Sequence, residues 1–318
     1  MSATKPLILP YGDAAIAEAA RVIASGGCVG VPTETVYGLA ADATDARAVA
    51  GIYEAKGRPS FNPLIVHVCD LAAAERIAVF DDAARALARR FWPGPLTLVL
   101  PARADNGVAS LVMAGHSTIA IRVPAHRAMQ ALLAATGKPL AAPSANASGG
   151  ISPTRAAHVA ASLGGRVPLV IDDGATPAGV ESTIVMGSQI LRPGPLTEEQ
   201  LFPGEGRSPA LNSESGAQPS GKEGVVSPGQ LASHYAPSKP LRLDATEAKD
   251  EWLIGFGEVA GDETLSASGD LTEAAANLFD ALHRADAGRA AKIAVAPIPE
   301  TGVGAAINDR LRRAAHPR

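Results

Sequence analysis

A break in composition divides this chain of 318 residues into two parts of unequal length. Fourteen of the 26 residues from 203 to 228 are Pro, Gly or Ser, and the apolar residues among them show no periodicity. Such segments bury too little apolar surface to fold by themselves, and they behave as linkers. We therefore expect a domain at residues 1–202, a linker at residues 203–236 and a smaller domain at residues 237–318.

The overall composition indicates a soluble globular protein with 47% hydrophobic and 19% charged residues. The formal net charge of −4 argues against a protein that binds nucleic acid through bulk electrostatics. Cys28 and Cys69 stand in apolar surroundings, far apart in sequence, and we expect two buried thiols of a reducing cytosol. The first ten residues lack the apolar region of a signal peptide, and no apolar run approaches a membrane span. The expected location is the cytoplasm.

Helical and strand-like patterns are interspersed along the first 202 residues without strict βαβ order. This arrangement favours an α/β domain with a twisted, mixed sheet. We expect the first helix to begin with Asp13 as its N-cap. The expected helices cover residues 13–25, 45–56, 82–91, 126–136 and 154–163. The expected strands lie within residues 28–32, 63–68, 95–101, 117–124, 168–174, 181–186 and 189–194.

The part of the chain after the linker repeats this pattern on a smaller scale. Three strand-like runs and two helical stretches predict a small α/β, Rossmann-like domain of about 80 residues. The strand-like runs cover residues 240–245, 251–257 and 292–299, and the helices cover residues 270–285 and 305–315.

Two cations flank a glycine in K-G-R-P at residues 56–59, where a probable helix ends. Lys56 and Arg58 there suit an anion held on a rigid turn between ordered elements. They equally suit a helix terminus that places cations against the macrodipole and ends at Gly and Pro. This segment alone does not separate the two interpretations.

Two further segments carry small polar side chains in places where ligands bind. A-A-P-S-A-N-A-S-G at residues 141–149 ends a strand and opens a loop of hydroxyl and amide groups, which suits phosphate or carboxylate binding but also a plain turn. P-T-E-T-V-Y-G-L at residues 32–39 places Thr33 and Thr35 at the carboxyl end of a strand. The usual nucleotide motifs fail, because there is no P-loop and the glycines of 255–261 and 302–307 miss the Rossmann spacing.

Taken together, these segments resemble the YrdC-like threonylcarbamoyl-AMP synthases. The resemblance rests on P-T-E-T-V-Y-G-L, K-G-R-P with Asn62-Pro63-Leu64 and His67, and A-P-S-A-N. It rests also on W-P-G-P-L-T at residues 92–97 and I-R-V-P at residues 121–124, and it covers roughly the first 200 residues. S-P-G-Q-L-A-S-H-Y-A-P at residues 227–237 resembles the junction of the long, two-domain form of that family.

The resemblance implies a reaction in which L-threonine, bicarbonate and ATP give threonylcarbamoyl-AMP and pyrophosphate, assisted by Mg²⁺ and without a permanently bound cofactor. A partner complex then passes the threonylcarbamoyl group to tRNA. The catalytic cations implied are Lys56 and Arg58. The implied ATP-binding residues are Lys56, Arg58, Asn62, Thr118, Ser144, Asn146, Ser152, Arg192 and Tyr235, and the implied threonine-binding residues are Thr35, His67, Arg122, Ala142 and Ser182.

Several of these residues also have purely structural interpretations. His67 lies in an alternating run and would serve as a satisfied core histidine. Ser182 would be an ordinary strand residue, and Arg192 a surface arginine before a Pro-Gly turn. Tyr235 would anchor the second domain, whereas the long form of the family implies a lid over the nucleotide that keeps water from the product.

Two other classes of protein fit the sequence less well. An RNA-binding module of the same fold would need stacking aromatics and phosphate-tracking cations, and only 4% of the residues are aromatic. Direct tRNA binding therefore stays secondary. A carbamoyl-transfer maturation factor would carry acylphosphatase-like and zinc-finger segments, for which the chain has no paired cysteines.

Overall fold

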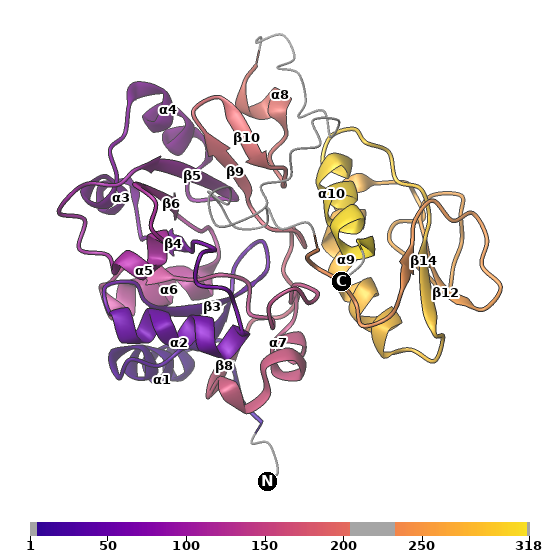
Figure 1. The fold of residues 1–318 in the computed structure, drawn as a ribbon, viewed down its shortest axis with the longest axis horizontal. Coiled ribbons are helices and arrows are strands. Elements are labelled where there is room, and N and C mark those ends of the chain that lie inside the picture. Colours follow the sequence, from indigo (N-terminus) through magenta and orange to yellow (C-terminus); the bar gives the residue numbers. More distant parts are fainter. Residues whose placement is uncertain (1–4, 204–232, 317–318) are drawn as a thin grey trace.

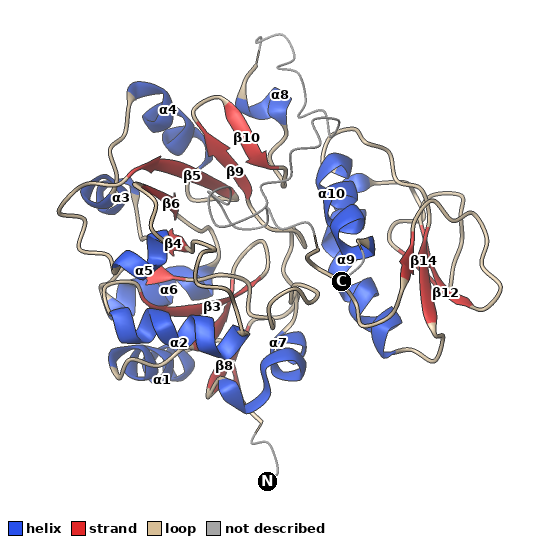
Figure 2. Cartoon of the chain, in the orientation of Figure 1, coloured by secondary structure: helices blue, strands red, loops and turns tan. Residues whose placement is uncertain are grey.

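The computed structural model describes residues 5–203 and 233–316. These residues form two units, each built on one sheet (Figures 1 and 2). We call residues 5–203 the first unit, residues 233–237 the connecting segment and residues 238–316 the C-terminal unit. Most of the expected linker, residues 204–232, lies outside the described residues.

The first unit contains a ten-stranded sheet in the order β1-β8-β2-β3-β7-β4-β6-β5-β9-β10. The sheet contains parallel pairs such as β4–β6 and antiparallel pairs such as β5–β6, which confirms the expected mixed sheet. The strands are β1 (Leu7–Pro10), β2 (Val29–Pro32), β3 (Tyr37–Asp42), β4 (Ile65–His67), β5 (Leu96–Pro101), β6 (Thr118–Arg122), β7 (Leu140–Ala141), β8 (Leu169–Asp172), β9 (Thr183–Met186) and β10 (Gln189–Arg192).

Helices surround this sheet and supply the rest of its core. They are α1 (Asp13–Ala24), α2 (Ala46–Lys56), α3 (Leu71–Ile77), α4 (Asp82–Phe91), α5 (Ser110–Met113), α6 (Arg127–Thr136), α7 (Ala156–Leu163), the 3-10 helix η1 (Gly164–Arg166) and α8 (Glu198–Leu201). The five expected helices correspond to α1, α2, α4, α6 and α7.

Local capping explains where α2 begins and ends. The Asp45 side chain accepts hydrogen bonds from the amides of Arg47 and Ala48, and Gly57 ends the helix in the left-handed region at φ 60°. The expected cap at Asp13 is wrong, because Gly12 is the N-cap of α1 and Asp13 lies in the first turn. There its carboxylate favours the positive end of the helix without capping it.

The C-terminal unit has a four-stranded parallel sheet in the order β11-β14-β12-β13. Its strands are β11 (Leu241–Arg242), β12 (Glu251–Gly255), β13 (Glu263–Thr264) and β14 (Lys292–Val295), and its helices are α9 (Leu271–Ala287) and α10 (Gly304–Ala315). Both helices lie between this sheet and the first unit (Figure 1).

One hydrophobic cluster contains residues of both units. Val36, Ile151 and Val180 of the first unit pack in the same buried cluster as the apolar faces of α9 and α10. Backbone approach is close as well, because a Cβ on Gly179 would stand 2.2 Å from the carbonyl oxygen of Ala275 in α9. The C-terminal unit is therefore docked by apolar packing against the first unit.

The two cysteines differ in environment. Cys28 is buried, and burial raises the pKa of its thiol to about 12, so it is inert at neutral pH. Cys69 is exposed, which corrects the expectation of a second buried thiol. It lies two residues after the end of β4 and directly before Asp70, the N-cap of α3.

Candidate active site

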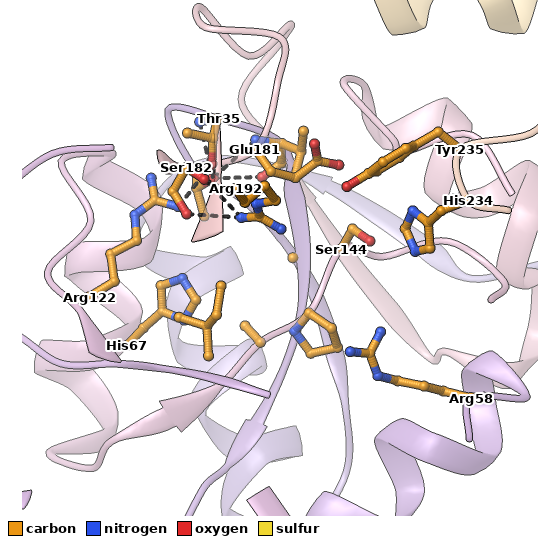
Figure 3. A pocket seen from close by; sticks show the side chains of 16 residues that line it. Thr35, Arg58, His67, Arg122, Ser144, Glu181, Ser182, Arg192, His234 and Tyr235 are labelled. Atoms are coloured by element: carbon orange, nitrogen blue, oxygen red, sulfur yellow. Dashed lines mark hydrogen bonds between the residues drawn. The ribbon is translucent and has the colours of Figure 1, made fainter. Parts of the chain in front are cut away.

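One pocket opens between the carboxyl ends of several strands and the connecting segment (Figure 3). Its open space, including the solvent at its mouth, is about 540 Å³. Arg122 and His67 lie on one side, and Arg58, His234 and Tyr235 lie on the other. The lining residues are Thr33, Thr35, Val36, Gly38, Arg58, Ile65, His67, Arg122, Ala142, Pro143, Ser144, Glu181, Ser182, Arg192, His234 and Tyr235.

The turn between β2 and β3 is held by its own hydroxyl groups. The Thr33 hydroxyl donates to the carbonyl oxygen of Val36 at 2.6 Å and accepts from the amides of Thr35 and Val36 at 3.2 Å each. The hydroxyls of Thr33 and Thr35 are 2.8 Å apart. These bonds form a rigid polar turn at the carboxyl end of β2, as the sequence indicated.

Arg122 ends β6 and is almost completely buried. Its guanidinium donates from Nε to the carbonyl oxygen of Gly94 at 3.1 Å and from Nη1 to the Thr35 hydroxyl at 3.0 Å. Its Nη2 lies 2.6 Å from a carboxylate oxygen of Glu34. Burial by itself would raise the pKa of Glu34, but the Arg122 charge, the hydrogen bond from Arg122 and backbone hydrogen bonds together lower it. Since a guanidinium has five N–H groups, donors on Nη1 and Nη2 remain for an incoming carboxylate.

His67 stands beside Arg122 because β4 and β6 pair in parallel with these two residues in register. Burial and the adjacent Arg122 charge lower the pKa of His67 to about 3. The imidazole is therefore neutral at physiological pH, with one nitrogen a donor and the other an acceptor.

Ser182, which precedes β9, connects the pocket to two neighbours. Its hydroxyl is 2.7 Å from the Thr97 hydroxyl and accepts from Nη2 of Arg192 at 3.1 Å. Arg192, at the end of β10, also donates from Nε to the Ser182 carbonyl oxygen at 3.1 Å. Arg192 is thus a buried residue of the pocket, and the alternative of a surface arginine is wrong.

The two cations of K-G-R-P have different environments. The Lys56 ammonium is buried and donates to the carbonyl oxygens of Ser144 and Asn146, and burial lowers its pKa well below the usual value. Arg58 donates to the side chain of Asn62 at 2.6 Å and lines the pocket. Burial lowers the pKa of Arg58 to about 10, so it remains charged at neutral pH.

The loop after β7 is fastened to this helix end. Besides the two Lys56 bonds, the amide of Ser148 donates to the Lys56 carbonyl oxygen at 2.8 Å. The side-chain nitrogen of Asn146 (Nδ2) donates to the carbonyl oxygens of Ala147 and Gly150 at 2.9 and 2.8 Å. Asn146 therefore orders the loop, while Ser144 and the backbone of Ala142 line the pocket.

The connecting segment forms one wall of the pocket. Ala236 pairs with Gly150 in a β-bridge, and Tyr235 has a left-handed backbone at φ 62°. The Tyr235 ring stacks on Phe279 of α9, with centroids 5.6 Å apart. Its buried hydroxyl has no hydrogen-bond partner among the described residues, and neither has Nδ1 of His234. Such groups are costly unless a ligand or water satisfies them.

Nine of the residues implied by the resemblance line this pocket: Thr35, Arg58, His67, Arg122, Ala142, Ser144, Ser182, Arg192 and Tyr235. Five lie outside the lining. Lys56, Asn62 and Asn146 support it as described, Ser152 lies behind Glu181, and Thr118 lies at the beginning of β6. Thr118 is separated from the pocket by the length of that strand.

Two polar residues of the lining were missed in the sequence, Glu181 and His234. Each directly precedes a residue that was singled out, Ser182 and Tyr235. Their position in E-S-T and H-Y-A-P was the available signal, but their role depends on contacts with distant parts of the chain.

The mixed sheet and the cation-lined pocket are those of an α/β enzyme that binds small anionic ligands. Two family models match: one described as "Telomere recombination" (Sua5_yciO_yrdC) at residues 21–194, and "Threonylcarbamoyl-AMP synthase, C-terminal domain" at residues 199–316. The chain belongs to the family of threonylcarbamoyl-AMP synthases, in the form that has the additional C-terminal domain.

Individual relatives match over nearly the whole chain. The threonylcarbamoyl-AMP synthase of Bacillus subtilis is 40% identical over 332 residues, which cover 96% of this chain and 94% of the relative. That of Pyrococcus abyssi is 40% identical over 323 residues, 93% of each chain. A crystal structure of P. abyssi Sua5 complexed with L-threonine superposes with a TM-score of 0.86 at 37% identity and covers 97% of each chain.

Proposed function

We propose that this pocket condenses L-threonine, bicarbonate and ATP into threonylcarbamoyl-AMP and pyrophosphate, which makes the chain a nucleotidyltransferase. The observation that carries the proposal is the pairing of two unlike anion sites in one pocket. Arg122 and Arg58 line it from opposite sides, with Ser144 between them (Figure 3). The family membership and the threonine complex of the P. abyssi relative support the same reaction.

The side around Arg122 suits an amino acid. The free donors of its guanidinium would bind the threonine carboxylate as a fork. The hydroxyl of Thr35 and the neutral imidazole of His67 adjoin it, and Ser182 and the backbone of Ala142 complete the lining. A site that hydrogen-bonds the threonine hydroxyl rejects valine, because the valine complex would leave a buried polar group without a partner.

The side around Arg58 suits a triphosphate. Arg58 and Arg192 are charged donors, and Ser144 lies on a loop whose course Lys56 fixes. Lys56 thus acts first on the loop: its two carbonyl bonds set the position of the groups that would meet the phosphates. The hydroxyl of Tyr235, which lacks a partner among the described residues, is available to the nucleotide.

The chemistry divides into two steps that need positioning more than an enzymic nucleophile. The threonine amine attacks the bicarbonate carbon, a C–N bond forms, and water is released to leave a carbamate. A carbamate oxygen then attacks the α-phosphorus of ATP in line, and the bond to pyrophosphate breaks. Arg58 and Arg192 would stabilise the charge that develops on the leaving group.

The lining does not fit a dedicated metal site. Among the described residues, Glu181 is the only acidic residue that lines the pocket. One of its carboxylate oxygens accepts from Ser152 and the other from Arg310. We assign Mg²⁺ to the phosphate oxygens and water of the incoming ATP, the usual mode of this ion.

The product would serve a complex that transfers the threonylcarbamoyl group to tRNA, in the cytoplasm. In the parts of the chain that the structure describes, no helix has the length and apolarity needed to cross a membrane.

One experiment tests the function directly. The full chain is incubated with ATP, bicarbonate and Mg²⁺, together with threonine, serine or valine. Pyrophosphate is followed by a coupled assay and the adenylate by mass spectrometry. We expect threonine-dependent pyrophosphate release in step with threonylcarbamoyl-AMP, and much less with valine. Pyrophosphate release at the same rate with and without threonine would overturn the proposal.

A further inference from the structure

Arg310 of α10 is an arginine with no exposed surface, although it belongs to the C-terminal unit. Its Nε donates to Oε2 of Glu181 in the first unit at 3.0 Å, and its Nη1 donates to the carbonyl oxygen of Pro193 at 2.7 Å. Asp309 balances it from the same helix, with Oδ2 3.0 Å from Nη1. The guanidinium therefore crosses from one unit to the other in fixed geometry.

The contact with Glu181 continues to the nucleotide side of the pocket. The second carboxylate oxygen of Glu181 accepts the hydroxyl proton of Ser152 at 2.5 Å. Because a serine hydroxyl has one proton, this bond leaves Ser152 only its lone pairs for other partners. Glu181 lines the pocket, so one carboxylate joins Arg310, Ser152 and the ligand space.

A second contact of Arg310 reaches Tyr235 in the connecting segment. The guanidinium carbon lies 5.4 Å from the centroid of the Tyr235 ring, within cation–π distance. Phe279 supports the same ring from α9. The ring that closes the pocket is thus held by side chains of the C-terminal unit.

Charge explains why this arginine matters for a triphosphate. An unpaired carboxylate at Glu181 would repel the nucleotide and would itself be costly to bury. Arg310 pairs with one oxygen of this carboxylate and offsets its charge, while the other oxygen accepts the Ser152 hydroxyl. Removing the cation therefore changes both the field at the pocket and the orientation of Ser152.

We propose that Arg310 is a positioning residue for ATP, through which the C-terminal unit fixes Glu181, Ser152 and Tyr235. The proposal rests on the assignment of this side of the pocket to ATP in the proposed function. It predicts that loss of Arg310 weakens ATP binding while threonine binding stays intact, because Arg122 and its partners do not touch Arg310.

The test compares full-length Arg310→Met and Arg310→Lys with the wild type in the pyrophosphate assay. We expect Arg310→Met to raise the KM for ATP about tenfold and leave the KM for threonine within about twofold. Arg310→Lys, which keeps the charge but loses the fork, should raise the KM for ATP about threefold. Arg312→Met is the matched control, since Arg312 lies on α10 but is exposed and pairs with Glu300.

A double variant separates positioning from mere folding. If Arg310 acts through Glu181, Arg310→Met/Glu181→Gln should show about the same tenfold increase as Arg310→Met, not the product of two effects. A lower melting temperature with unchanged KM for ATP would make Arg310 purely structural and overturn the proposal. Multiplying effects would overturn it too. If Arg310→Met does not fold, Arg310→Lys decides by the same KM ratio.

The wild-type measurement distinguishes a failure of the Arg310 proposal from a failure of the proposed function. A wild type without threonine-dependent pyrophosphate release refutes the function itself. An active wild type with unaltered ATP kinetics in folded Arg310 variants refutes only the role of Arg310.

Discussion

The Arg122 guanidinium donates to the Thr35 hydroxyl at 3.0 Å, although 87 positions separate the two residues in the sequence. The contact joins the end of β6 to the turn after β2. Each partner makes a second hydrogen bond: Arg122 also donates to the Gly94 carbonyl oxygen, and the Thr35 hydroxyl is hydrogen-bonded to that of Thr33. This end of the pocket, which we propose binds the threonine carboxylate, is therefore held in place by hydrogen bonds within the protein.

Arg122→Lys tests this end of the pocket. Lysine keeps the charge but cannot hold Gly94, Thr35 and a carboxylate at once. We expect the KM for threonine to rise about tenfold or more, with the KM for ATP nearly unchanged. Steady-state pyrophosphate kinetics measure both, and Arg76→Lys on the exposed side of α3 is the control. Equal rises in the two KM values would contradict a role confined to threonine.

Lys56→Met tests the fastening of the loop after β7. Methionine has a similar length but leaves the carbonyl oxygens of Ser144 and Asn146 without their donor. We expect kcat/KM for ATP to fall at least about tenfold and the free energy of unfolding to fall by about 1–3 kcal/mol. Kinetics and denaturant titration check the two effects, with exposed Lys292→Met as the control. An ATP defect without any stability loss would place the ammonium on the phosphates instead.

Tyr235→Ala tests the wall made by the connecting segment. Without the ring, water reaches the mixed anhydride while the product waits. We expect the yield of intact threonylcarbamoyl-AMP to fall more than pyrophosphate release does. Tyr235→Phe, which keeps the stack on Phe279, should preserve the yield better. Equal losses of product and pyrophosphate in Tyr235→Ala would argue against this shielding.

Gly179→Ala tests the docking of the two units. Gly179 has φ 68°, and its added Cβ would meet the Ala275 carbonyl oxygen at 2.2 Å. Strain and the clash together should cost about 2–4 kcal/mol of unfolding free energy and loosen the C-terminal unit. Gly187→Ala is a matched control, since Gly187 has φ 60° and open space around it. Denaturant titration and small-angle scattering compare the two variants, and identical behaviour would refute the docking contact.

The histidine pair at the interface predicts a pH dependence. His283 of α9 stacks on His158 of α7 at 3.8 Å, and its Nε2 is 3.1 Å from the Ser152 carbonyl oxygen. Burial and the His158 charge lower the pKa of His283 to about 4, below its ordinary value near 6.5. The unfolded chain therefore binds this proton more readily, so His283 stabilises the fold above pH 6.5.

That stability is lost as the pH falls from about 6.5 to about 4. Melting temperatures measured across this range should fall less steeply in His283→Gln than in the wild type. Asp280, which pairs with His158 and Arg155, is present in both proteins and contributes equally. Parallel curves would show that His283 does not carry the effect.

Much of the fold was predictable because its signals are local. The caps at Asp45 and Asp270 and the glycine at residue 57 mark helix ends by short-range hydrogen bonds and backbone preference. Short strands such as β7 (Leu140–Ala141) have too few residues for a periodicity, and the sheet order depends on contacts between distant segments.

The same difference between local and long-range signals applies to the site. The K-G-R-P turn offered both a helix end and an anion site, and the structure combines them: α2 ends there and Arg58 lines the pocket. Nothing in the local sequence shows that Lys56 turns to two carbonyl groups, because its partners lie about 90 positions away. Likewise, the sequence around Glu181 does not show that its carboxylate pairs with Arg310, which lies 129 positions further on.

The hydrophobic cluster that contains residues of both units has a thermodynamic consequence. Val36, Ile151 and Val180 pack among residues of α9 and α10, and each is the chain neighbour of a polar residue in or behind the pocket: Thr35, Ser152 and Glu181. A ligand that orders these polar residues also orders the apolar surface on which the C-terminal unit rests. By reciprocity, the factor by which docking tightens ligand binding is the factor by which the ligand tightens docking. By this linkage, substrates in the pocket strengthen the docking of the C-terminal unit on the first unit, and release of the product weakens that docking.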